Sequence, residues 1–252
     1  MKFGLALGGG GARGVAHLGV IKGLEEAGFK PDVIAGTSIG SIAGALYARG
    51  FSPDEMFAIS SNFNMLRVFR PDMPLDGLSS MKGLSNSLAP YIGGLDFSEL
   101  GIKFLAVATS LINGNEVVLD KGSVVDAVCA SCCVPGFFNP IKRGSDLLVD
   151  GGLVSPTPVN ALKRLGVEKI VSVSLGHMRT VGKRLNMPGI LGRSYEIMED
   201  QLSNLQALNA DVAIRVNTGD FSTFSLKKNK ELYDLGLKAA RSKVAEIKNL
   251  LK

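Results

Sequence analysis

The apolar residues of this chain fall into two spacings that alternate along most of its length. Short unbroken apolar runs predict buried β-strands, and longer segments with apolar residues three or four positions apart predict amphipathic helices. Strands are expected over residues 3–7, 33–35, 147–149, 169–175 and 212–216. Helices are expected over residues 12–27, 39–49, 124–133, 158–165, 187–208 and 231–251. This alternation predicts an α/β fold with a largely parallel central sheet.

Two local signals add further elements. The segment 52–55 (SPDE) has the spacing of a capping box with proline at the first helical position, so another helix is expected to begin there. Asn113-Gly114 separates the apolar segments 104–111 and 116–119 and predicts an antiparallel hairpin. Residues 61–80 are less regular, and we interpret them as a lid-like or connecting segment.

Length and composition indicate a globular protein with a single domain over residues 1–252. The chain has 252 residues, of which 46% are hydrophobic, and no linker divides it. No apolar run reaches the roughly 18 residues that a membrane-spanning helix needs, and the N-terminus lacks a signal-peptide pattern. The clustered Cys129, Cys132 and Cys133 lack the further ligands of a zinc site and predict buried thiols in a reducing compartment. We therefore expect a soluble, cytoplasmic protein without a metal or cofactor.

The formal net charge is +5, and the basic residues are spread along the chain. The densest tracts are residues 227–230 and the C-terminal Lys238, Arg241, Lys243 and Lys248. Such tracts are typical of a solvated helix face, and the alternative is transient attraction to an anionic membrane surface. Nucleic acid is not an expected partner, because no aromatic residues are interleaved with the basic ones. No feature indicates an oligomeric state.

The first glycine-rich turn follows the first predicted strand. Its Gly9-x-Gly11-x-x-Gly14 spacing matches the fingerprint of dinucleotide-binding proteins, which also requires an acidic residue about 20 positions later, at the end of the second strand. Here Asp32 precedes the second strand instead. A row of backbone N–H groups is also what an oxyanion hole needs, and this second interpretation agrees with the segment that follows.

The second turn carries a serine. Gly36-x-Ser38-x-Gly40 lies between a predicted strand and a predicted helix, which is the setting of a nucleophile elbow. A serine at this place is close to the helix N-terminus, where free N–H groups favour developing negative charge. The alternative is that Ser38 serves only as a helix N-cap.

A serine hydroxyl becomes nucleophilic when a base removes its proton, and the chain contains two histidines. His17 lies on the first predicted helix and is expected to make a packing or capping contact. Ser38, Asp150 and His177 follow the order of an α/β-hydrolase triad, but that nucleophile normally follows several strands, whereas Ser38 follows the second. Asp150 is the better candidate, since it ends a predicted strand and precedes Gly151 and Gly152. Its alternative role is an Asx-turn.

The three motifs, in this order, resemble the patatin-like phospholipase family. The segment 130–135 (ASCCVP), with Phe138 and Pro140 after it, also resembles the stretch that precedes the aspartate in that family. The resemblance covers about residues 1–175 and implies a three-layer α/β/α sandwich with a mainly parallel central sheet. It implies a dyad without histidine, with Ser38 as the nucleophile and Asp150 as the general base. The implied oxyanion hole and its support are formed by Gly9, Gly10, Gly11 and Arg13.

The function implied is that of a serine esterase that cleaves acyl esters of phospholipids or lysophospholipids through an acyl-enzyme intermediate. The alternatives are acyl transfer by the same dyad and a low-turnover regulatory protein that keeps the fold. Asp150 is expected within about 3 Å of Ser38, where partial burial would raise its basicity. Apolar residues of the segment 61–95 either cover an acyl groove or belong to the core; they are Phe63, Met65, Leu66, Val68, Phe69, Met73 and Met81.

Overall fold

The computed structural model describes residues 3–63, 79–176, 186–219, 221–222 and 227–252. Within these residues eight strands form one mixed sheet. In chain order they are β1 (Phe3–Leu7), β2 (Val33–Thr37), β3 (Lys103–Ser110), β4 (Glu116–Leu119), β5 (Ile141–Arg143), β6 (Asp146–Asp150), β7 (Lys169–Gly176) and β8 (Val212–Asn217). The order across the sheet is β5-β6-β3-β2-β1-β7-β8, and β4 also pairs with β3.

The parallel part of the sheet runs from β3 through β2, β1 and β7 to β8. Strands β4 and β6 are antiparallel to β3, and β5 is antiparallel to β6. The expected parallel sheet is thus present, with an antiparallel extension at one edge. Because β1 and β2 are central neighbours, the turns that follow them lie side by side at the carboxyl edge, where ligands bind in open α/β sheets.

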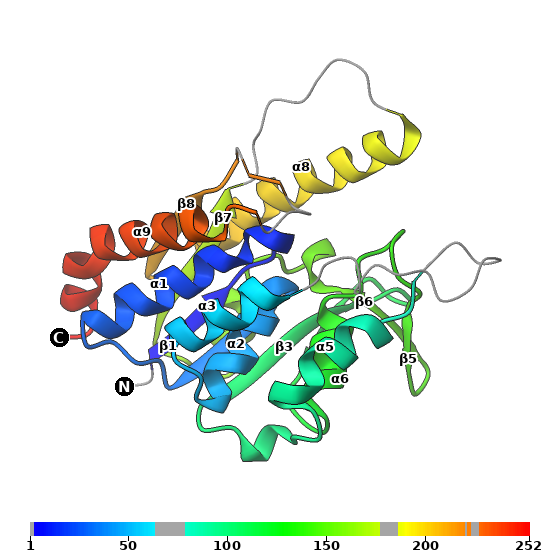
Figure 1. Cartoon of the computed structure of the whole chain (residues 1–252), viewed down its shortest axis with the longest axis horizontal. Helices are drawn as coiled ribbons and strands as arrows, with labels where there is room; N and C mark the ends of the chain where they lie inside the picture. Colours follow the sequence, from blue (N-terminus) through cyan, green and yellow to red (C-terminus); the bar gives the residue numbers. More distant parts are fainter. Residues whose placement is uncertain (1–2, 64–78, 177–185, 220, 223–226) are drawn as a thin grey trace.

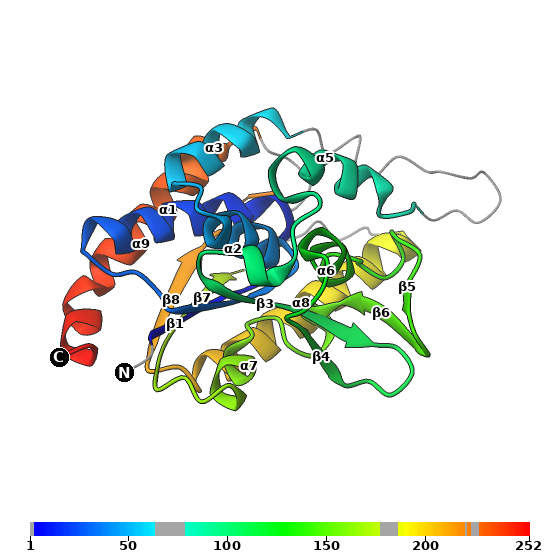
Figure 2. The same ribbon diagram turned by 90° about the horizontal axis from the view of Figure 1, so that it is seen from below.

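Helices cover both faces of the sheet and make three layers, as expected (Figures 1 and 2). On one face lie α1 (Val15–Glu26), α2 (Ile39–Arg49), α3 (Pro53–Asn62), α5 (Lys82–Ile92), α6 (Val124–Ser131) and α9 (Asn229–Leu250). On the other face lie α7 (Val159–Arg164) and α8 (Met187–Ala207) (Figure 2). Three short 3-10 helices complete the described elements, namely η1 (Gly11–Gly14), η2 (Phe97–Glu99) and η3 (Gly151–Leu153).

The strand periodicity explains why the core has two parts. In β1, Leu5 and Leu7 pack with the residues of α1 and α2, whereas Ala6 between them packs with Val159 and Leu162 of α7. Successive side chains of a strand point to opposite faces, so a strand covered on both faces must be apolar throughout. The strands appear in the sequence as short unbroken apolar runs because both of their faces are buried.

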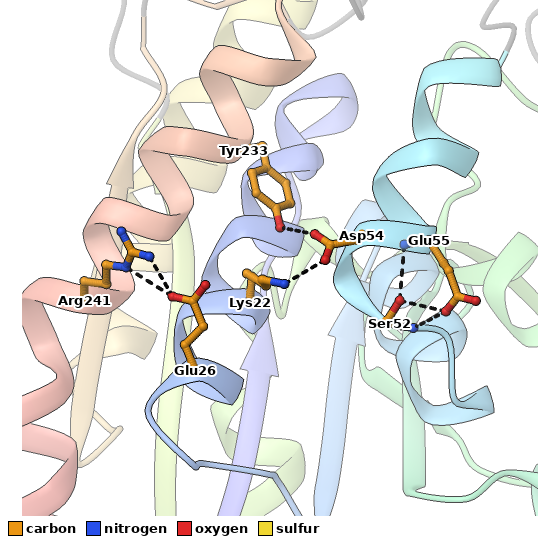
Figure 3. Close-up of polar contacts among 7 residues, drawn as sticks. All are labelled: Lys22, Glu26, Ser52, Asp54, Glu55, Tyr233 and Arg241. Atoms are coloured by element: carbon orange, nitrogen blue, oxygen red, sulfur yellow. Dashed lines mark hydrogen bonds and ion pairs between the residues drawn. The ribbon is translucent and has the colours of Figure 1, made fainter.

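Polar contacts on the surface join α1, α3 and α9 (Figure 3). Lys22 of α1 binds Asp54 of α3 at 2.7 Å, and the Tyr233 hydroxyl of α9 donates to the same carboxylate at 3.0 Å. Arg241 of α9 binds Glu26 of α1 at 2.7 Å. Such exposed pairs contribute roughly 0–1 kcal/mol each. Arg241, the basic residue of α9 in these pairs, is thus solvated on the exposed face of the helix.

Most of the predicted elements are present with ends shifted by one to three residues. Ser52 forms the expected capping box with Glu55, and Gly114 forms the hairpin turn with φ 73°. Two elements were not predicted. Helix α5 lies within the segment 61–95 and contains Pro90, which obscured its period, and β5 has only three residues and is mostly exposed. The predicted lid-like segment 61–80 lies largely outside the described residues.

Candidate active site

Ser38 occupies the turn between β2 and α2 in a backbone conformation that side chains rarely adopt. Its φ is 53° and its ψ is −127°, and among the described residues it is the only non-glycine with positive φ. Such a conformation costs roughly 1–3 kcal/mol and occurs where the surrounding structure imposes it. Its side chain makes no capping hydrogen bond to α2, so the N-cap alternative does not account for this serine.

The glycines around Ser38 allow the turn to pack against its neighbours. A Cβ at Gly36 would lie 2.5 Å from the Gly40 carbonyl oxygen, and a Cβ at Gly40 would lie 2.2 Å from that of Leu7. Both contacts are with backbone, which cannot move aside. The small residues of the motif therefore bring α2 onto the ends of β1 and β2, as expected for a nucleophile elbow.

Two further serines hold the backbone of Ser38. The Ser38 N–H donates to Ser131 Oγ at 2.9 Å, and Ser131 Oγ donates to the Val107 carbonyl at 2.6 Å. Ser41 Oγ donates to the Ser38 carbonyl at 2.6 Å. Ser131, at the end of α6, is fully buried and links the nucleophile turn to β3. The sequence analysis assigned no role to Ser131, because a serine that ends an apolar helix carries no local signal of its partner.

Asp150 reaches the same edge of the sheet from the antiparallel strand β6. The register pairs Asp150 with Ala108 of β3, while the preceding β3 residue, Val107, pairs with Thr37 of β2. The Asp150 N–H donates to the Cys133 carbonyl at 2.9 Å. The end of α6 thus contacts both residues, Ser38 through Ser131 and Asp150 through Cys133.

The two glycines after Asp150 let the chain cross over β3 toward β2. A Cβ at Gly151 would lie 2.3 Å from the Val107 carbonyl oxygen and 3.1 Å from Thr37 Cγ2. Farther along, the Thr37 hydroxyl donates to the Ser155 carbonyl at 2.7 Å. Asp150 Oδ1 accepts a hydrogen bond from the Gly152 N–H at 2.7 Å, so the Asx-turn considered for this residue is present as well.

The Asp150 carboxyl group is buried beside Ser38. Burial raises the pKa of Asp150 to about 6, and hydrogen bonding from the Ser38 side chain and the Gly152 N–H opposes this rise. Oδ2 is buried and makes no hydrogen bond of regular geometry within the described residues. A carboxylate with a raised pKa is a stronger base than an exposed one, so this oxygen is suited to accept the proton of the Ser38 hydroxyl.

The first glycine turn is held by its neighbours on both sides. The Gly8 N–H donates to the Val173 carbonyl and the Gly9 N–H to the Pro156 carbonyl, both at 2.9 Å. Gly10 and Gly11, with φ of 148° and 58°, then lead into η1. The first N–H groups of a helix have no partner within it. The Gly9 N–H already donates to the Pro156 carbonyl. The N–H groups expected to bind an anion in this turn are therefore those of Gly10 and Gly11.

Arg13 and His17 support this turn from within. Arg13 is 1% exposed, and its Nε donates to the Gly10 carbonyl at 3.1 Å. His17 Nε2 lies 2.8 Å from the Gly8 carbonyl. Burial lowers the pKa of His17 to about 4, so its neutral ring donates from Nε2 at neutral pH. His17 thus makes the packing contact expected of it. His177, the other histidine, lies outside the described residues.

An apolar cavity opens next to Ser38. Its open space, including the solvent at its mouth, is about 960 Å³. Apolar side chains of α1, α2, α3 and α5 line it, among them Leu18, Ile42, Ile59 and Leu88. Phe63 and Met81 also line it, which favours the groove interpretation for these two residues of the segment 61–95. Met65, Leu66, Val68, Phe69 and Met73 lie outside the described residues.

The three cysteines are buried near the site. Burial raises the pKa of Cys129 and Cys133 to about 12 and holds that of Cys132 well above its usual range, so all three are protonated, apolar side chains. This agrees with their interpretation as small buried residues. The described part of the chain contains no group of acidic, histidine or cysteine residues that could hold a metal ion. None of its described helices combines the length and the apolar character needed to cross a membrane.

At one edge of this α/β sheet lie a strained serine, a buried aspartate beside it and an adjacent apolar cavity. A family model for patatin-like phospholipases matches residues 5–163, and the chain belongs to that family. This membership agrees with the expected class of enzyme, a carboxylic ester hydrolase.

Curated relatives and solved structures agree with this assignment. The chain is 33% identical over 177 residues to an uncharacterized NTE family protein, Rv1063c, of Mycobacterium tuberculosis, covering 69% of this chain and 49% of that protein. It is 31% identical to lysophospholipase NTE1 of Candida albicans, covering 69% of this chain and 13% of that protein. The chain thus spans about half the length of the mycobacterial relatives, and less of the fungal one.

The similarity to solved structures concerns the fold. VipD of Legionella pneumophila superposes with a TM-score of 0.65 at 15% identity, covering 98% of this chain and 66% of that one. The type III effector ExoU superposes with a TM-score of 0.53 at 16% identity, covering 97% and 53%.

Proposed function

We propose that this protein hydrolyses acyl esters of phospholipids or lysophospholipids with Ser38 as the nucleophile and Asp150 as the general base. The observation that carries this proposal is the placement of Ser38, on a strained turn between the buried Asp150 carboxyl group and an apolar cavity. A relative that is 31% identical to this chain over 179 residues is named a lysophospholipase, which supports a lipid ester as the substrate.

The reaction proceeds in two halves. Ser38 Oγ attacks the carbonyl carbon of the ester while its proton passes to Asp150, and the carbonyl oxygen becomes an oxyanion. The N–H groups of Gly10 and Gly11 stabilise this charge, and Arg13 holds their loop through the Gly10 carbonyl. Collapse of the intermediate breaks the ester C–O bond, and Asp150 returns the proton to the leaving alcohol. Water then attacks the acyl-enzyme and loses its proton to Asp150. The bond between Ser38 Oγ and the acyl carbon breaks, Asp150 returns the proton to Ser38 Oγ, and the fatty acid is released.

The proposed nucleophile is tested with a fluorophosphonate probe and a lysophospholipid. The wild-type protein is expected to be labelled at Ser38 and to release fatty acid, whereas Ser38→Ala does neither. A wild-type protein that is folded but is neither labelled nor active would refute the proposal.

The cavity is the proposed site of the acyl chain. Its lining is mostly apolar, with Ser38 and Ser60 among the few polar residues, and an aliphatic chain would lie against side chains such as Leu18, Ile42 and Leu88. Burial of each methylene group contributes about 0.8 kcal/mol. Substrates with long acyl chains are therefore expected to be preferred over short ones.

Narrowing the cavity is expected to reverse this preference. Ile59 of α3 lines the cavity and is only partly buried, so Ile59→Trp adds volume at the wall with limited strain on the core. The ratio of kcat/KM for a long-chain ester to that for a short-chain ester should fall about tenfold or more. Ala58→Trp, at the exposed neighbouring position outside the cavity, is the control and should leave the ratio unchanged. An equal ratio in all three proteins would place the acyl chain elsewhere.

We also propose that the protein works in a reducing, cytoplasmic setting and associates transiently with lipid surfaces. The three buried, free thiols are compatible with a reducing setting. The association with lipid surfaces is supported by α8, whose first turns project away from the sheet and expose Met187, Ile190 and Leu191 (Figure 1). Apolar side chains of this kind can enter the headgroup region of a bilayer. Replacing all three with serine is expected to reduce co-sedimentation with anionic vesicles severalfold, and unchanged co-sedimentation would contradict this role.

A further inference from the structure

Helix α8 presents a polar face to the loop that follows Asp150. The Thr157 N–H donates to Gln206 Oε1 at 3.0 Å, and the Thr157 and Ser203 hydroxyls are 2.7 Å apart. Gln206 Nε2 donates to the Val154 carbonyl at 2.9 Å. Residues four apart lie on one face of a helix, so Glu199 and Tyr195 continue the face of Ser203 toward the active site. α8 is therefore attached to the segment that carries the proposed base.

Glu199 lies between the first glycine turn and the Gly151-Gly152 turn after Asp150. A Cβ at Gly9 would lie 2.5 Å from Glu199 Oε1 and 3.7 Å from Ser38 Cβ. A Cβ at Gly152 would lie 3.1 Å from the same Oε1 and 3.0 Å from Asp150 Oδ1. One oxygen of a buried carboxyl group thus packs against the oxyanion loop and against the turn after Asp150. The absence of side chains at both glycines makes room for it.

The charged and titratable groups around Glu199 come from several elements. Arg13 of η1 attracts negative charge at Glu199, and Asp150 of β6 repels it. On α8 itself, Glu196 and Asp200 also repel it, although Glu196 binds Arg193 and Asp200 binds Arg215 of β8. Tyr195, one turn earlier on α8, stays neutral near pH 7, because burial raises the pKa of its hydroxyl well above its usual range.

We propose that Glu199 is a positioning residue of the reaction, whose neutral carboxyl group packs the oxyanion loop against the Asp150 turn and whose ionisation inhibits acyl transfer. The inference rests on the function proposed above. In the neutral form, Glu199 adds no charge beside the oxyanion held by Gly10 and Gly11. In the ionised form, it places a second negative charge next to Asp150 and opposes the oxyanion, which low-dielectric surroundings make costly.

Burial and the charge of Asp150 raise the pKa of Glu199 to about 8, so the neutral form predominates near pH 7. A general base is active when deprotonated, and burial raises the pKa of Asp150 to about 6. With increasing pH, kcat/KM should therefore rise around pH 6, where Asp150 loses its proton. It should fall again around pH 8, where Glu199 loses its proton.

The decisive variant is Glu199→Gln, which keeps the size of the side chain and cannot ionise. At pH 9 the wild-type value should be about tenfold below its maximum, since about a tenth of Glu199 is then protonated, while the variant shows no fall. The rise of kcat/KM around pH 6, which depends on Asp150, should remain in both proteins. Rates of Ser38→Ala, measured at each pH, provide the correction for spontaneous hydrolysis.

Glu196→Gln is the matched control, one turn earlier on α8 with the same chemical change. It removes a charge that raises the pKa of Glu199, so its alkaline limb should persist and move to slightly lower pH. The inference is refuted if kcat/KM of Glu199→Gln falls at alkaline pH as that of the wild type does. It is also refuted, without any variant, if kcat/KM of the wild type stays level past pH 9. An inactive wild-type protein refutes the proposed function instead, so the two failures are distinguishable.

Discussion

Asp150→Asn is expected to lower kcat/KM for ester hydrolysis by about 10²–10⁴-fold, the usual contribution of a general base. The asparagine side chain has the same shape and can still accept the Gly152 N–H through its carbonyl oxygen, but it cannot take a proton from Ser38. The loss should therefore lie in kcat, with the fold preserved. Steady-state hydrolysis together with a thermal melt measures both.

Two further variants make this result specific. Asp146→Asn is the control on the same strand, since Asp146 accepts a hydrogen bond from Ser110 at 2.6 Å, away from the proposed dyad. It should retain activity within about threefold. His177→Ala is the test of the triad considered for this chain, and it is expected to retain activity as well. Near-normal turnover by Asp150→Asn, or loss of activity in a folded His177→Ala, would remove Asp150 from the role of base.

Gly40→Ala is expected to lower the free energy of unfolding by about 3 kcal/mol or more. The added Cβ would lie 2.2 Å from the Leu7 carbonyl oxygen and 2.6 Å from that of Gly8. Both atoms belong to the backbone of β1 and the turn after it, so relief requires α2 to move away from the sheet. In a chain of this length, this loss corresponds to a melting temperature lower by about 6–12 °C.

Gly192→Ala is the matched control for this substitution. Gly192 also lies within a helix, but a Cβ there would meet no atom within 4 Å. Alanine has the higher helix propensity, so the control should be neutral or stabilising by up to about 1 kcal/mol. Chemical unfolding of both variants and the wild type gives the comparison. A melting temperature of Gly40→Ala equal to that of the wild type would show that the turn is not closely packed.

Much of the architecture was predictable because it depends on local patterns. Strands covered on both faces must be apolar throughout, so β1 and β7 were found close to their true ends. Ser52 marks the start of a helix through capping hydrogen bonds, and Asn113-Gly114 marks a hairpin through its turn conformation. Both effects act within about four residues. Helix α5 was missed because Pro90 interrupts its pattern, and its packing against α6 and α2 depends on distant parts of the chain.

The candidate nucleophile and base were also readable from the sequence, since Ser38 and Asp150 lie in short motifs whose glycines serve local turns. The contacts that hold them together come from distant segments. Ser131 binds the Ser38 N–H across 93 residues, and the Gly9 N–H donates to the Pro156 carbonyl. Glu199 reaches the first glycine turn and the turn after Asp150 from α8, a helix on the far face of the sheet.

By itself, then, the sequence determined the succession of strands and helices, the two glycine turns and the residues proposed for the chemistry. Only the tertiary structure decided which N–H groups remain for the oxyanion, how deeply Asp150 is buried and which carboxyl group lies beside it. The physical reason is that hydrogen bonding and turn geometry act over a few residues, whereas desolvation and the fields that set a pKa depend on every element packed around the group.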